Sequence, residues 1–88
     1  MGHQVRTEPL TIAEIKAKSA DNFVNEVIQI SLGEIIESSL EGFLDILEDR
    51  VIGDAGALTD LEYDIVGNGM YNDLHMRVTG FVTLTEDM

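Results

Sequence analysis

The chain has no cysteine, no tryptophan and one proline, and its five Lys and Arg residues face 17 Asp and Glu residues. The lack of cysteine excludes disulfides, thiolate metal sites and thiol catalysis. Because direct binding to DNA, RNA or an anionic membrane surface needs clusters of basic residues, we expect none of these partners. No apolar run approaches the roughly 20 residues of a membrane-spanning helix, and the amino terminus lacks the apolar core of a signal peptide. We therefore expect a cytoplasmic protein.

Composition indicates one small folded domain. The hydrophobic fraction of 44% argues against disorder despite a formal net charge of −12. The polar residues 1–8 predict a flexible N-terminal arm, and residues 9–88 the domain itself. Thr11 and Glu14 have the spacing of a capping box, which predicts a helix from Ile12 to about Ser19.

Residues 22–32 fit two kinds of secondary structure. Val24, Val27 and Ile28 follow helical spacing, whereas Ile28 and Ile30 alternate with polar residues as in a strand. We favour a helix that bends where the next helix begins, and keep a short strand as the alternative.

A long amphipathic helix is expected over residues 32–52. Ser31 and Glu34 form a second capping box at its start, and Gly53 suits the left-handed position after its end. One half of the helix surface is apolar, and we expect it to pack on the rest of the domain. The residues of this half include Ile35, Ile36, Leu40, Phe43, Leu44, Ile46, Leu47 and Val51.

The charged residues on the opposite face of this helix are all acids. With about 100° per residue, its six carboxylates fall within an arc of roughly 120°. Since like charges at these spacings repel by a few tenths of a kcal/mol, a solvated helix face normally mixes signs. An ordinary solvated face of an acidic protein is the first interpretation of this pattern, and a docking surface for a basic partner and a divalent-cation site are the alternatives. The candidate interaction residues are Glu34, Glu37, Glu41, Asp45, Glu48 and Asp49.

The last third predicts an antiparallel hairpin with strands at about 58–66 and 74–85. Apolar and polar residues alternate in both segments, and Asn68-Gly69 between them is a strong signal for a two-residue turn. The main objection is that this turn places Asp64 opposite Asp73, so a longer Gly-rich loop from Gly67 to Asp73 is the alternative.

The two-residue turn also fixes which residues face each other. Apolar residues then meet apolar ones and acids meet bases, as stable cross-strand pairs require. Gly80 is expected to mark a bulge or bend in the second strand. The expected pairs are Tyr63 with Leu74, Leu61 with Met76, Glu62 with His75 and Asp60 with Arg77.

A hairpin alone does not make a stable sheet, because three strands or a covering helix are needed. Phe81 also lies on the strand face opposite Val78 and Val82, so both faces carry apolar residues. We therefore expect an α+β fold in which N-terminal helices pack on the hairpin. A homodimer or larger assembly would complete the sheet.

The sequence contains few groups that could carry chemistry. His75 and Arg77 are interpreted as charge partners in the hairpin, and we expect no catalytic, cofactor or metal site. The leading hypothesis is a small, acidic, non-catalytic interaction or regulatory module that docks on a basic protein. The alternatives are a nucleic-acid mimic that inhibits a DNA-binding protein and a small enzyme with its site at an oligomer interface.

Overall fold

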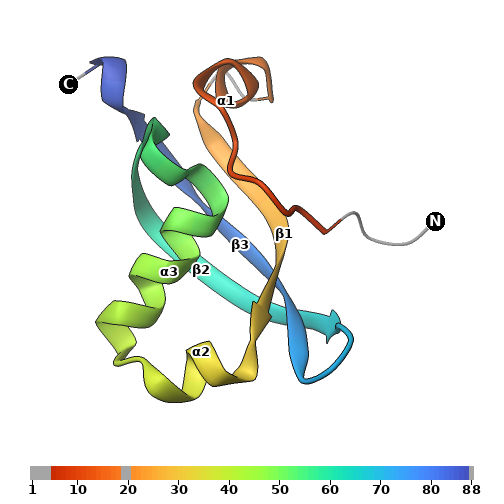
Figure 1. Ribbon diagram of the computed structural model, residues 1–88. Coiled ribbons are helices and arrows are strands. Elements are labelled where there is room, and N and C mark those ends of the chain that lie inside the picture. The colour runs from red at the N-terminus through yellow and green to blue at the C-terminus, as the bar shows by residue number, and fades with distance from the viewer. Residues whose placement is uncertain (1–4, 19–20, 88) are drawn as a thin grey trace.

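The computed structural model describes residues 5–18 and 21–87, and Figure 1 shows a molecule of two layers. One layer is a three-stranded antiparallel sheet in the order β1-β3-β2, and the helices lie on one of its faces. The Cα atoms extend 18 Å along the shortest axis, which is room for one sheet and one layer of helices. The expected α+β class is confirmed. The elements are α1 (Ile12–Lys18), β1 (Phe23–Ser31), α2 (Leu32–Glu37), α3 (Leu40–Ile52), η1 (Gly53–Ala55), β2 (Gly56–Asn68), β3 (Asp73–Leu84) and η2 (Thr85–Asp87).

Residues 22–32, whose spacing fits both a helix and a strand, contain strand β1. The favoured helix is therefore wrong, and the strand that was kept as the alternative is present. Val24, Ile28 and Ile30 point to the helix side of the sheet and are at most 3% exposed. β1 pairs with β3, with Ile28 opposite Met76. This pairing overrides the local helical spacing. The chain thus supplies its own third strand, which removes the main reason for expecting another copy to complete the sheet.

The predicted long acidic helix is two helices, α2 and α3. Ser38 and Ser39 separate them in extended conformations, and the Ser39 side chain accepts a hydrogen bond from the Gly42 N–H at the start of α3. Serine at this position competes for the backbone and begins a new helix. The expected capping box of Ser31 is present, and Gly53 ends α3 with φ 52°.

The N-terminal helix α1 begins with the expected capping box of Thr11 and Glu14. It ends at Lys18, and Ser19 of the predicted helix lies outside the described residues. Ile15 is 1% exposed and joins the core. Lys16 forms an ion pair with Glu86 of η2, which ties the two ends of the described chain together.

The hairpin forms, but its turn is not Asn68-Gly69. β2 continues through Asn68, and residues 69–72 make a longer loop. Tyr71 and Asn72 adopt left-handed conformations in this loop, with φ 54° and 66°. The longer loop that was kept as the alternative is therefore nearer to the structure.

The longer loop shifts the register of β2 against β3. Tyr63 lies opposite Val78 and Asp64 opposite Arg77. In the expected register Asp64 would have faced another acid, whereas here it faces a base. This difference favours the observed register over the expected one. None of the expected pairs forms, namely Tyr63 with Leu74, Leu61 with Met76, Glu62 with His75 and Asp60 with Arg77.

The bulge expected at Gly80 lies across from it, in β2. The register shifts between Thr59 and Glu62, and Asp60 in this interval has φ 54°. A Cβ atom on Gly80 would come within 3.0 Å of the Leu58 side chain and 3.1 Å of the Thr59 carbonyl oxygen. Glycine on β3 thus makes room for the bulge in its neighbour.

The core lies between the sheet and the helices. Leu47 and Val51 of α3 and Val78 of β3 are fully buried there. No described helix covers the other face of the sheet. There the rings of Phe23 and Phe81 pack in a tilted arrangement, 5.1 Å between centroids, and most neighbours are polar. The sheet therefore has one dry face and one solvated face.

Candidate interaction surface

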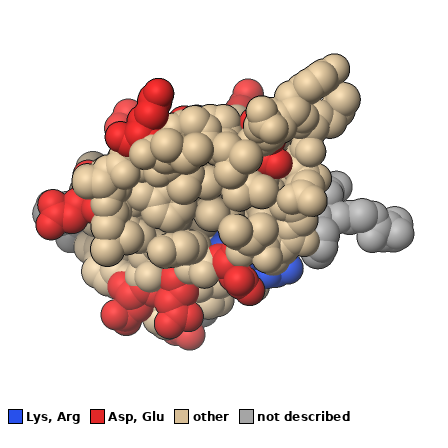
Figure 2. All heavy atoms as spheres, turned by 90° about the horizontal axis from the view of Figure 1, so that it is seen from below, with Lys and Arg blue, Asp and Glu red and all other residues tan. Residues whose placement is uncertain are grey.

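The six candidate carboxylates do not form one stripe, because they are divided between α2 and α3. Glu34 and Glu37 belong to α2, and the other four belong to α3. Figure 2 views the molecule from the end where α2 and the start of α3 lie, and acidic atoms there form separate groups around the margin. The break at Ser38 and Ser39 thus removes the continuous acidic face that a single helix would have had.

Two of the six carboxylates act within the chain. Glu34 accepts hydrogen bonds from the Ser31 backbone and side chain and forms an ion pair with Arg50. Glu48 accepts a hydrogen bond of 2.9 Å from the Leu58 N–H, at the start of β2. These two side chains hold α2 and α3 to their neighbouring strands.

The remaining four carboxylates lie on the surface, and no described cation pairs with them. All five Lys and Arg residues of the chain are engaged elsewhere. Four form ion pairs with other acids, and the fifth, Arg77, donates to the Asn25 side chain at 2.9 Å. Among the described residues, no Lys or Arg side chain forms an ion pair with these four acids. They are Glu37, Glu41, Asp45 and Asp49.

Exposed apolar residues lie on α3 and β2 around the contact between Phe43 and Tyr63, and the sequence did not predict their exposure. We define the apolar patch as Leu40, Tyr63 and Ile65, which are 66%, 44% and 56% exposed. The Phe43 ring meets the Tyr63 ring edge-on at 5.2 Å between centroids. Leu40 is one turn before Phe43 on α3, and Ile65 shares a face of β2 with Tyr63. α3 and β2 thus expose a joint apolar surface.

Most charged atoms at this end of the molecule lie toward the margin of the view in Figure 2, where acidic groups predominate. One acidic group, with basic atoms beside it, lies inside the outline. Ile36 of α2 is also 78% exposed, so the expectation that Ile36 and Leu40 pack inward is wrong. The Ser38-Ser39 pair was the available signal, because two adjacent capping residues interrupt a helix.

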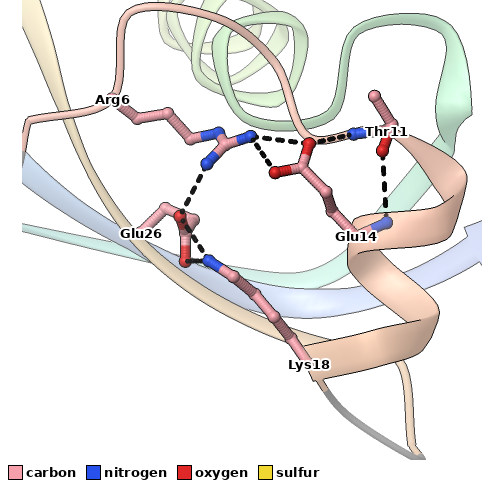
Figure 3. Close-up of polar contacts among 5 residues, drawn as sticks. All are labelled: Arg6, Thr11, Glu14, Lys18 and Glu26. Carbon is pink, nitrogen blue, oxygen red and sulfur yellow. Dashed lines mark hydrogen bonds and ion pairs between the residues drawn. The ribbon is translucent and has the colours of Figure 1, made fainter.

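A second polar cluster joins the N-terminal segment to α1 and β1 (Figure 3). One guanidinium nitrogen of Arg6 donates to both Glu14 oxygens, at 2.9 and 3.0 Å. Arg6 and Lys18 both also contact Glu26 of β1. Hydrogen bonding from the Thr11 N–H, and then from Arg6, lowers the pKa of Glu14. Two cations and two anions balance, so this cluster is structural.

The remaining candidate groups do not assemble a reactive site. Arg77 contacts Asn25, while His75 lies opposite Gln29 on the solvated face of the sheet. Hollows on either side of Arg6 are lined by residues of both charge signs. The described residues include no group of three or more His, Asp or Glu side chains placed to hold a metal ion.

None of the helices in the described part of the chain is long and apolar enough to cross a membrane. No family model, no curated protein and no solved structure matches this chain. The interpretation of the surface therefore depends on its own geometry and charge.

Proposed function

We infer that this protein is a small non-catalytic interaction module that binds a basic protein through the apolar patch and the exposed acids of α2 and α3. The observation that carries the proposal is the engagement of all five cations within the chain. Within the described part of the chain, no ion pair neutralises the exposed acids of α2 and α3, so a basic partner would supply their counter-charge. Single-sign surfaces of this kind steer association with oppositely charged partners.

The apolar patch supplies what charge alone does not. Exposed charges give modest affinity in water, whereas burial of apolar area contributes about 25 cal/mol per Å². An interface with an apolar centre and a charged margin is the usual arrangement in protein complexes. Leu40, Tyr63 and Ile65 would form this centre.

The alternatives have less support. A nucleic-acid mimic needs a row of carboxylates to replace phosphates, and here Glu34 and Glu48 are engaged within the chain. An enzyme with its site at His75 would need a second reactive side chain close to it, and His75 lies opposite Gln29 and Gly67. A second copy of the chain is a further candidate partner, because the outer edge of β2 pairs with no described strand.

The proposal is tested by selecting random displayed peptides on the immobilised protein. We expect enrichment of peptides that combine Lys or Arg with apolar residues, and loss of their binding to Leu40→Glu. Thr83→Glu is the matched control, since it adds the same charge at an exposed position on the solvated face. Failure to enrich any peptide, or equal binding to the two variants, would overturn the proposal.

A further inference from the structure

The outer edge of β2 is an open strand edge next to the apolar patch. β2 pairs with β3 on its other side and with no other strand among the described residues. The pairing is regular from Glu62 to Ile65, between a bulge on each side. Alternate backbone N–H and C=O groups of such a stretch point outward and have no strand partner.

The side chains of this stretch alternate between two kinds of surface. Tyr63 and Ile65 point to the helix side and belong to the apolar patch, while Glu62 and Asp64 point to the solvated face. A strand added to this edge would place its own side chains alternately on both faces. One set would lie beside the patch, and the other beside the two acids.

We propose that the ligand of this surface is an extended segment of a basic protein, which adds to the open edge of β2 as a fourth strand. Apolar side chains of the segment lie on the apolar patch, and Lys or Arg residues between them lie beside Glu62 and Asp64. Backbone hydrogen bonds give affinity and alternate side chains give specificity in this mode of recognition. The inference rests on the proposed function and names the form of its partner.

A second copy of the chain fits this edge poorly. Antiparallel pairing of two β2 edges has two classes of register. One class places the acids of one copy opposite the acids of the other, which is destabilising. The other class places acids opposite Tyr63 and Ile65. Acids on an edge strand thus oppose self-pairing and favour a basic strand.

The experiment uses an alternating Lys-Val peptide of about nine residues, a common strand length. We expect it to bind the full chain, to shift the backbone amide signals of residues 62–65 in NMR spectra and to slow their hydrogen exchange. The control peptide carries N-methyl groups on alternate residues, which removes the backbone donors on one edge. Two controls, one for each set of residues, cover both edges. Since each lost backbone hydrogen bond weakens binding, we expect at least one control to bind about tenfold more weakly.

A charge swap tests the side-chain part of the proposal. Glu62→Lys combined with Asp64→Lys should weaken binding of the Lys-Val peptide and strengthen binding of a Glu-Val peptide of equal length. Thermal unfolding of the double variant verifies that it folds, and Glu62→Gln with Asp64→Asn provides a milder pair if it does not. Lys-Val binding that is unchanged by the swap would overturn the assignment of the basic residues.

The outcomes separate strand addition from docking in general. Equal binding of the Lys-Val peptide and both N-methyl controls would overturn strand addition while leaving an interaction module in place. Strand addition would also be overturned if the Lys-Val peptide did not bind and the peptides selected by display shifted amide signals outside residues 62–65. A dimer of the free protein that protects residues 62–65 would assign the edge to a second copy and overturn the proposal.

Discussion

The two edges of the sheet differ in how the chain treats them. At the β1 edge, the Arg6 N–H donates to the Val27 carbonyl at 2.7 Å, and the Arg6 side chain contacts Glu14 and Glu26. At the outer edge of β2, no described segment supplies a further strand, and Arg77, which lies opposite Asp64, donates to the Asn25 side chain. The N-terminal segment thus pairs with the β1 edge at one point, whereas no described segment pairs with the outer edge of β2. We call these the closed edge and the open edge.

The largest difference between the two edges is expected when apolar volume is removed at each edge in turn. Ile28 of β1 is 1% exposed and Ile65 of β2 is 56% exposed. Ile28→Ala should lower the free energy of unfolding by about 2–5 kcal/mol, because it leaves a cavity. Ile65→Ala should change it by about 0.5 kcal/mol or less. Urea unfolding measures both, and equal losses would contradict the contrast between the edges.

Removing charge should have different consequences at the two edges. Arg6→Met keeps most of the apolar stem but deletes the contacts with Glu14 and Glu26, so we expect a loss of about 1 kcal/mol. Asp64→Asn at the open edge should change stability by about 0.5 kcal/mol or less, because Asp64 is exposed and Arg77 opposite it donates to Asn25 rather than forming an ion pair with it. Urea unfolding of the two variants measures the difference. A larger loss of unfolding free energy for Asp64→Asn than for Arg6→Met would contradict the view that the Arg6 contacts stabilise the fold and that Asp64 does not.

Features set by neighbouring residues could be predicted from the sequence. Both capping boxes form, and Gly53 ends α3, because each depends on side chains within one turn of the backbone. Strand β1 could not be decided in this way. Val24, Val27 and Ile28 fit the helical period, and Ile28 and Ile30 fit the strand period. Pairing with β3, which is distant in the sequence, selects the strand.

The candidate site was predicted only in part, because its geometry depends on a helix break and on a register. The acids on α3 are exposed as expected, but Glu34 and Glu48 are used within the chain. The exposure of Leu40 and Ile65 depends on how far α3 extends over β2. The spacing of residues within one segment contains no information on that overlap.

The smallest expected effect concerns the pH dependence of the closed edge. The lowered pKa of Glu14 means that the folded state favours its charged form. This contribution to stability is complete above the ordinary glutamate pKa of about 4.3 and is lost as the pH falls through the lower folded-state pKa. The stability gap between the wild type and Glu14→Gln should therefore close in acid. The same comparison can be made in the Arg6→Met background, where the Thr11 N–H still donates to Glu14. Most of the stability difference that Glu14→Gln produces should therefore persist in that background. Thermal unfolding across the acid range measures it, and a gap that widens in acid would contradict the assignment.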